Sequence, residues 1–281
     1  MNSVGVAQMS TAPISDAITA PSIRPMPLRG KGFVVVPLRA AAVVVFAGIL
    51  IGWECLGRFG LINTVFLPTP SQVVGAFFDL FAMGTIYRHV GDSMVRLLGG
   101  WLLGTVAGLS CGFAIGMLSL ARAIGVPVIS AMFPIPKIAI LPLLILWMGI
   151  GEAPKIATVA LGVFFPTAIS TYCGVDNVPR NLIRMAQSFN LSMRTIIFKV
   201  LLPGTLPAIL SGFRITASIA LILLVAAEMI GAQYGIGAFI LSAGNLMQTD
   251  QLLAGVMMLS LLGLLVHALL SKIETMLLRW R

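Results

Sequence analysis

Charged side chains are scarce in this 281-residue chain: they make up 10% of it, against about 25% in soluble domains. Hydrophobic residues make up 58%, and the mean hydropathy is +1.03. A soluble fold of this size would lack the polar residues needed to cover its surface. The composition therefore excludes an ordinary soluble domain and indicates a protein whose solvent is lipid.

Clusters of reactive side chains are lacking as well. Cys55, Cys111 and Cys173 each lie in an apolar stretch far from the others, and His89 and His267 are isolated. Without a CxxC or His/Cys cluster, no metal site is expected. No set of nucleophile and base is visible, so we assign no catalytic residues and do not expect an enzyme. A GxxxxGK[ST] phosphate loop is also missing, so an ATP site of that type is not expected in this chain.

Apolar stretches near the length that a helix needs to cross a bilayer, about 20 residues, recur along the chain. Period-2 alternation is lacking, so the stretches are expected to be helices, which satisfy their own backbone polar groups in lipid. We predict an all-α integral membrane protein with six transmembrane helices, at about 37–57, 90–118, 124–148, 155–175, 206–231 and 250–275. The third stretch is interrupted by Pro127, Pro134, Pro136 and Pro142.

Two segments outside these stretches differ in kind. Residues 1–32 are rich in Pro, Ser, Thr and Ala and have no apolar core; they predict a flexible cytoplasmic tail without a secretory signal, ahead of a transmembrane domain over 33–281. In the linker 58–89, Ser71 is a plausible N-cap. A short amphipathic helix over 71–83 is expected there, lying at the outer surface.

Basic residues indicate the orientation. With both termini cytoplasmic, the inner side holds 13 of the 18 Lys and Arg residues and three of the nine acids, a net charge of +10, and the outer half carries −1. The five outer basic residues are Arg58, Arg88, Arg96, Lys137 and Lys155. The high pI is thus a signal of topology, and nucleic-acid binding is not expected.

Glycines recur every fourth residue in the second stretch, which places them on nearly one helix face. They are Gly100, Gly104, Gly108, Gly112 and Gly116. Five in register predict close approach of another helix. That helix belongs either to this chain or to a second copy.

The region 177–207 is well patterned although it is not a span. Pro179 can begin a helix, Asn190 can adopt the left-handed conformation that ends one, and Ser192 can cap a second helix that runs to a break at Leu202-Pro203. Apolar residues share one face of each helix (Leu182, Met185, Ala186 and Phe189, then Ile196, Ile197 and Val200), and Arg180, Arg184, Arg194 and Lys199 lie elsewhere. The pair is either a surface helix pair on anionic lipid or a docking element for a cytosolic partner.

This helix pair resembles the EAA loop of binding-protein-dependent ABC permeases, in which E-A-A is followed by three residues, Gly, nine residues and I-x-L-P. Arg184-Met185-Ala186 occupies the E-A-A positions, with Arg184 reversing the Glu charge; Asn190 occupies the Gly position, and Val200-Leu201-Leu202-Pro203 follows at the family spacing. The resemblance implies an ATPase-docking set in the loop at about 180–207, namely Arg184, Met185, Ala186, Phe189, Asn190, Leu191, Ser192 and Pro203.

The resemblance extends over about 45–275, to the branch of MetI-like permeases that includes sulfonate, taurine, nitrate and bicarbonate permeases. It is carried by Phe66-Leu67-Pro68-Thr69-Pro70, Ser93 to Arg96, Pro134-Ile135-Pro136, Trp147-Met148-Gly149-Ile150-Gly151-Glu152, Phe164-Phe165-Pro166 and Ala226-Ala227-Glu228-Met229. It implies the permease fold of a type I ABC importer in the bacterial inner membrane.

The resemblance also implies partners. They are a second permease copy, expected as a homodimer, two cytoplasmic ATPases that bind ATP and Mg, and a periplasmic or lipid-anchored binding protein. An aliphatic sulfonate or taurine is the favoured substrate, with nitrate, bicarbonate or a thiamine-precursor pyrimidine as alternatives. An ion-coupled secondary transporter is a more distant alternative, which would leave the helix pair at 180–207 without a role.

Ionisable residues inside the expected spans are costly and often functional, so we take three of them as candidates for the translocation path. Lys137 lies in the Pro-interrupted stretch, where its cation would either attract an anionic substrate or pair with a carboxylate or reach outward. Glu228 lies near the outer end of the fifth stretch and is either part of a gate or a member of an ion pair between helices. Arg96 is expected to pair with Asp92, four residues before it on the same helix.

Overall fold

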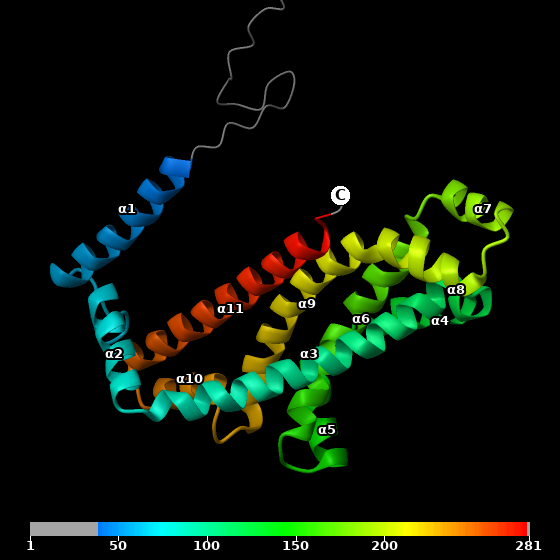
Figure 1. Ribbon diagram of the computed structural model, residues 1–281. Coiled ribbons are helices and arrows are strands. Elements are labelled where there is room, and N and C mark those ends of the chain that lie inside the picture. The colour runs from blue at the N-terminus through cyan, green and yellow to red at the C-terminus, as the bar shows by residue number, and fades with distance from the viewer. Residues whose placement is uncertain (1–38, 280–281) are drawn as a thin grey trace, which may run out of the picture. The chain divides into compact units, whose positions relative to one another are not determined.

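The computed structural model describes residues 39–279, and all regular elements there are helices (Figure 1). The chain divides into two units, residues 1–51 and 52–281, and α1 (Arg39–Arg58) crosses the boundary. The predicted tail, residues 1–32, lies outside the described residues. The other elements are α2 (Pro70–Ala82), α3 (Thr85–Met117), α4 (Ser119–Met132), η1 (Lys137–Ile140), α5 (Leu141–Met148), α6 (Ala153–Asp176), α7 (Arg180–Ser188), α8 (Met193–Ile196), η2 (Ile197–Leu201), α9 (Leu202–Gly231), α10 (Ile236–Asn245) and α11 (Thr249–Leu277).

Within the described residues, four helices are long and apolar enough to cross a membrane: α3, α6, α11 and the run α8–η2–α9 (Met193–Gly231). They cover the second, fourth, fifth and sixth predicted spans. The bent pair of α4 with η1–α5 gives a fifth span if the two parts are counted as one. The all-α membrane architecture is therefore confirmed, whereas the count of six spans, with α1 as the first, stays a prediction.

The third predicted span is bent by 87° between its two parts, at residues 133–136. Pro134 and Pro136 lie in this break, and proline supplies no backbone N–H to continue a helix. Pro127 lies inside α4 and does not end it. Pro142 is in the first turn of α5, where a missing N–H costs little. The same residue type thus breaks the span at one place and is accommodated at two others.

The glycine face of α3 packs against α6, so the partner helix that the sequence left open belongs to the same chain. A Cβ added at Gly104 would lie 2.4 Å from the backbone oxygen of Ala160, and one at Gly108 would lie 2.8 Å from that of Phe164. The five glycines face residues of α6 that also recur every fourth position: Val159, Val163, Thr167, Thr171 and Val175. Only glycine allows the two backbones to approach this closely.

The helix predicted over 71–83 is α2, but its N-cap is Thr69, not Ser71. The Thr69 side chain accepts from the backbone N–H of Gln72, and the Gln72 side chain accepts in return from the Thr69 N–H at 2.9 Å. Pro70 is the first helical residue, a position that favours proline, so the cap must precede it. The Ser71 hydroxyl instead donates to Glu54 Oε1 at 2.8 Å.

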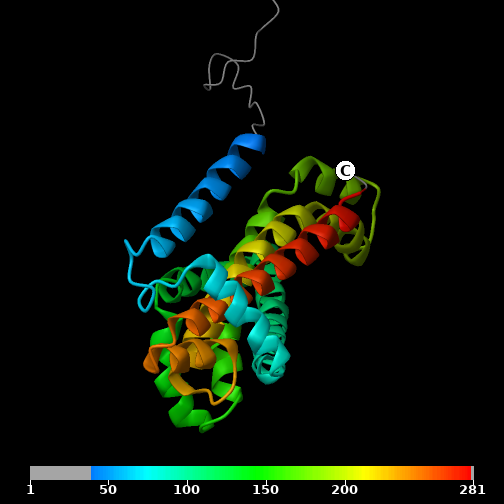
Figure 2. The ribbon, with the colours of Figure 1, turned by 90° about the vertical axis from the view of Figure 1, so that its left-hand side faces the viewer.

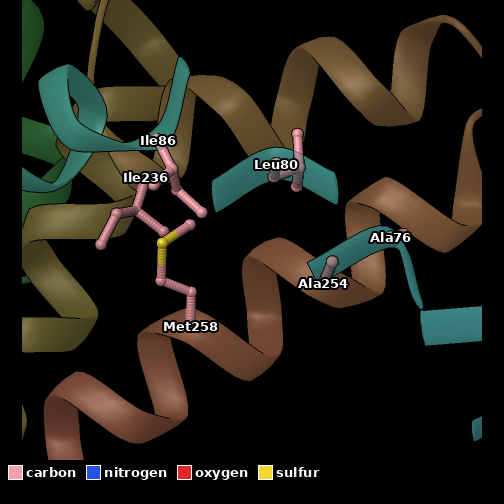
Figure 3. Close-up of a cluster of buried hydrophobic side chains, with 6 residues drawn as sticks. All are labelled: Ala76, Leu80, Ile86, Ile236, Ala254 and Met258. Atoms are coloured by element: carbon pink, nitrogen blue, oxygen red, sulfur yellow. The ribbon is translucent and has the colours of Figure 1, made fainter. Parts of the chain in front are cut away.

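One face of α2 is covered by other helices, so α2 is part of the bundle; its place at the outer surface stays a prediction. Figure 3 shows the buried cluster that joins α2 and the start of α3 to α10 and α11. Its members are Ala76, Leu80, Ile86, Ile236, Ala254 and Met258.

Helix α9 packs against both α6 and α11, and Figure 2 shows α11 running alongside it. A second cluster of buried residues fills the space between α3, α6 and α9: Leu97, Val159, Val163, Ala220 and Leu224. Arg214 of α9 also pairs with Glu274 of α11. The helices α3, α6 and α9 therefore form the framework on which the functional residues lie.

Candidate functional site

A helical hairpin formed by α7 and α8 follows α6, and its turn has the predicted geometry. Asn190 has φ +55°, the left-handed conformation expected of it. The N–H of Leu191 then bonds the oxygen of Ala186 at 3.2 Å, which closes the end of α7. Ser192 caps α8, since its side chain accepts from the backbone N–H of Thr195. Both turn residues act as the sequence predicts.

The predicted break at Leu202-Pro203 is wrong, because the helix continues through it. One π-helical turn (η2) lies just before the proline, and within it the N–H of Leu202 bonds the oxygen of Ile197, five residues back. This wider turn shifts the hydrogen-bond pattern, and Pro203 then falls in the first turn of α9. The hairpin is therefore joined rigidly to a membrane-spanning helix.

The hairpin has two apolar sides. Ala186 and Ile196 are buried, and Ile183 packs with Ile197 and Leu201 at the C-terminal end of α6. The opposite side is open to the surroundings, with Phe189 71% exposed. We call this side the exposed hairpin face; it consists of Leu182, Met185, Phe189, Leu191 and Met193.

The hairpin and the turn after it also carry four basic residues. Arg180, Arg184, Arg194 and Lys199 are all exposed. Among the described residues, Arg184 pairs with no carboxylate. An exposed apolar face accompanied by basic residues is typical of a docking surface.

A cavity of about 790 Å³ lies between the hairpin and the ends of α3, α4 and α6. Arg122 of α4 and Asp176 of α6 lie at its edge and form two parallel hydrogen bonds, 2.7 and 2.8 Å long. This fork joins α4 to α6 directly beside α7.

Arg96 does not pair with Asp92 as predicted. Its Nη1 donates to Glu228 Oε1 of α9 at 2.8 Å, and its Nε and Nη2 form a fork on Glu152. The Arg96 and Glu228 side chains are 2% and 0% exposed. The interaction energy of an ion pair is larger in this dry environment than for an exposed pair along one helix. The guanidinium therefore bonds carboxylates from other elements.

Four ionisable groups meet at this point: Arg96, Glu152, Lys155 and Glu228. We call them the outer ion cluster, after the side on which the predicted orientation places them. Lys155 Nζ lies 3.2 Å from Glu152 Oε1, and its side chain is 6% exposed. Glu152 is the one member that reaches the surroundings, with its side chain 54% exposed.

Glu228 also holds the beginning of α10. It accepts from Ser93 Oγ at 2.7 Å and from the backbone N–H of Gly237 at 2.8 Å. A carboxylate at a helix N-terminus is favourable because the exposed N–H groups carry partial positive charge. Arg96 Nη1 adds a bond to the oxygen of Tyr234 at 2.6 Å. The cluster therefore ties the turn before α10 to α3 and α9.

Sequence reasoning missed Glu152 and Ser93 as partners of Arg96 and Glu228, and Lys155 as a partner of Glu152. A signal for two of them was present, because the stretches Ser93 to Arg96 and Trp147 to Glu152 both carry the family resemblance. Lys155 lies three residues after Glu152, a spacing that indicates the pair observed but not its place beside Arg96.

The Arg96 guanidinium, and after it the Lys155 ammonium, hold the pKa of the Glu152 carboxyl below its usual value. Glu152 is thus ionised at neutral pH. Because the folded-state pKa is depressed, the stabilisation from these bonds is present above the ordinary carboxyl pKa. It is lost as pH falls through the lowered value.

Lys137 lies at the bend between α4 and η1, apart from the outer ion cluster in sequence. Its Nζ donates to the oxygens of Met132, Phe133 and Ile135 at 2.8, 3.1 and 2.7 Å. It also lies 4.5 Å from the centre of the Phe165 ring. The three donors of the ammonium are thus used on carbonyls at the break, of which the Met132 oxygen also accepts from the N–H of Ile135 at 3.3 Å. Over the described range, no group of three or more His, Cys, Asp and Glu residues is placed to hold a metal ion.

The comparisons with solved structures agree with this architecture. The chain is similar to a chain of the MetNI methionine ABC transporter in inward-facing conformations, with a TM-score of 0.61 at 20% identity over 70% of this chain and 97% of that one. A second crystal form of that transporter gives 0.60 at 21% identity, over 69% of this chain and 97% of that one. At these identities the likeness shows the fold.

Curated relatives are similar over most of their length. The taurine transport system permease protein TauC of Escherichia coli is 35% identical over 83% of this chain and 87% of its own. Putative aliphatic sulfonates transport permease proteins SsuC are 34% identical in Bacillus subtilis and 36% in Escherichia coli. They cover 82% and 86% of this chain, and 83% and 92% of their own. The model of the binding-protein-dependent transport system inner membrane component matches residues 104–277. The chain is therefore a multi-pass inner membrane protein and belongs to the family of binding-protein-dependent transport permeases.

Proposed function

We propose that the protein is the permease subunit of an ABC importer that carries an aliphatic sulfonate or taurine. The names of three relatives at 34–36% identity support the substrate class. The observation that carries the transport mechanism is the exposed hairpin face, joined without a break to the span α9. Nitrate, bicarbonate and a thiamine-precursor pyrimidine are the alternative substrates against which the sulfonate assignment is tested.

The energy source in this proposal is a pair of cytoplasmic ATPases that bind ATP and Mg and dock on the hairpin. An apolar face with 71% of Phe189 exposed is stabilised by burial against a partner. The continuous helix from Met193 to Gly231 then carries the motion of the hairpin into the membrane. The docking residues in this proposal are Arg184, Met185, Ala186, Phe189, Asn190, Leu191, Ser192 and Pro203.

Three further assignments complete the proposal. A second copy of this chain forms the other half of the translocation path as a homodimer. A periplasmic or lipid-anchored binding protein delivers the substrate at the outer side. Both termini are cytoplasmic, which places the hairpin on the ATPase side; the excess of basic residues at that side supports this orientation.

We also propose that the path passes the outer ion cluster and the bend at Lys137. Arg96 and Glu228 are ionisable groups buried within spans, which are rare without a function. The three carbonyl bonds of Lys137 support a role in holding the bend that lines the path, since an anion would have to displace those bonds to reach the ammonium.

Met185→Glu is expected to abolish co-purification of the ATPases without unfolding the permease. Met185 is 54% exposed, so the substitution places a charge on the docking face and leaves the permease core unchanged. The measurement is the ATPase-to-permease ratio after affinity purification of the co-expressed complex, with the melting temperature of the purified permease alongside.

The matched control is Gln187→Glu, the same new charge two residues further along α7 at another exposed position. It is expected to keep the normal ATPase ratio. Equal ratios for Met185→Glu and the unmodified chain would contradict docking on this face.

A further inference from the structure

The outer ion cluster is neutral only because Glu152 is part of it. Arg96 and Lys155 carry two positive charges, and Glu228 and Glu152 carry two negative ones. Glu228 is completely buried and is held by Ser93, Arg96 and Gly237. If the Glu152 carboxylate left, one positive charge in excess would remain in a site whose two cations are almost entirely buried.

Glu152 is also the member with the freedom to leave. It is the N-cap residue of α6, and its backbone oxygen accepts from the N–H of Ile156 at 3.0 Å. Its side chain makes no cap hydrogen bond and is 54% exposed. A rotation of the side chain therefore vacates the site while the helix and its cap stay in place.

The vacated site matches a small anion. Arg96 Nε and Nη2, which now bond the two Glu152 oxygens, form a planar fork that suits two oxygens of one acid group. Lys155 Nζ, which also donates to Glu152, supplies a further donor. A sulfonate has three oxygens, enough for the fork and the ammonium together.

We propose that Arg96 and Lys155 form an anion-binding site for the acid head of the substrate, and that Glu152 fills this site as a tethered competitor until substrate arrives. The choice of a sulfonate as ligand rests on the proposed function, whereas the existence of the site rests on the contacts alone. A tethered carboxylate competes at high effective concentration, so the site binds weakly and releases its ligand readily. That property suits a transport path and not a storage site.

The test is direct binding of ethanesulfonate and of acetate to the full-length chain in lipid nanodiscs, measured by titration calorimetry. Glu152→Gln removes the competing charge and is expected to tighten ethanesulfonate binding about tenfold or more, the equivalent of one charge-assisted hydrogen bond. Glu152→Asp keeps the charge on a shorter arm and is expected to give a smaller gain. The double variant E152Q/K155M is expected to lose the gain.

Glu54→Gln is the matched control. Glu54 is a second carboxylate of the outer half that bonds Ser71 and Arg58 and no member of the outer ion cluster. Its loss is expected to leave anion affinity unchanged. Equal affinities for Glu152→Gln and the unmodified chain would overturn the proposal, and so would an equal gain in Glu54→Gln or a full gain retained without Lys155.

The result also separates the site from the proposed function. If Glu152→Gln gains affinity for both anions but no sulfonate drives ATP hydrolysis by the complete transporter, the site stands and the sulfonate assignment falls. If sulfonate drives hydrolysis but Glu152→Gln shows no gain, the function stands and the site falls.

Discussion

Replacing Gly104 with alanine is expected to destabilise the folded chain by about 3 kcal/mol, at the upper end of what overpacking costs. The added methyl group would lie 2.4 Å from the backbone oxygen of Ala160 and 2.8 Å from the Cβ of Val163. A backbone oxygen cannot rotate away as a side chain does, so α3 and α6 would have to separate. The measurement is the midpoint of unfolding by SDS titration in detergent micelles.

Gly91→Ala is the control for this prediction. Gly91 also lies in α3, and a Cβ added there would have no heavy atom within 4 Å. It is expected to be neutral or slightly stabilising, because alanine favours a helix over glycine. If both variants unfolded at the same midpoint, the close approach of α3 and α6 would not be the source of stability.

The second large effect is expected at Arg96. Arg96→Met leaves the Glu228 carboxylate at 0% exposure without its cation, which costs about 3–5 kcal/mol for a buried pair. The same titration measures it. Because Glu228 also holds the first turn of α10, we expect amide hydrogen exchange to increase at Ile236 and Gly237 as well.

Adding Glu228→Gln to Arg96→Met is expected to recover part of this loss. The amide removes the unpaired charge. Its one oxygen can still accept from Gly237 N–H, and its NH2 group can donate to Ser93 Oγ, because a hydroxyl oxygen also accepts. Arg58→Met serves as the control, since the Arg58 side chain is 70% exposed in its pair with Glu54 and such pairs contribute about 1 kcal/mol or less. Strictly additive losses in the double variant would show that the buried charge pair is not the cause.

Local chemistry made the hairpin predictable from sequence. Asn190 is tolerated in the left-handed conformation and Ser192 caps the next helix, and both effects depend only on residues within one or two turns. The break predicted at Pro203 was wrong because proline usually ends a helix. Here Pro203 follows a π turn, which no sequence pattern indicated. The continuity matters for the proposed mechanism, in which the helix transmits motion that a break would absorb.

The rest of the site could not be predicted because it depends on contacts between residues far apart in the sequence. The five glycines of α3 predicted a closely packed helix. The residues of α6 that face them, from Val159 to Val175, are valines and threonines that gave no such signal. Arg96 was assigned to Asp92 because spacing along one helix is all that sequence provides. Its true partners, Glu152 and Glu228, are 56 and 132 residues away.

The central claim is that this chain moves an anionic substrate at the expense of ATP hydrolysed by partners docked on the exposed hairpin face. The most direct test is uptake of radiolabelled taurine into proteoliposomes containing the permease, its ATPases and its binding protein, with unlabelled sulfonates, nitrate, bicarbonate and a thiamine-precursor pyrimidine as competitors. We predict uptake that requires ATP, is blocked by unlabelled sulfonates, is lost in Met185→Glu and is kept in Gln187→Glu. Uptake by the permease alone without ATP, or uptake unaffected by Met185→Glu, would contradict the account.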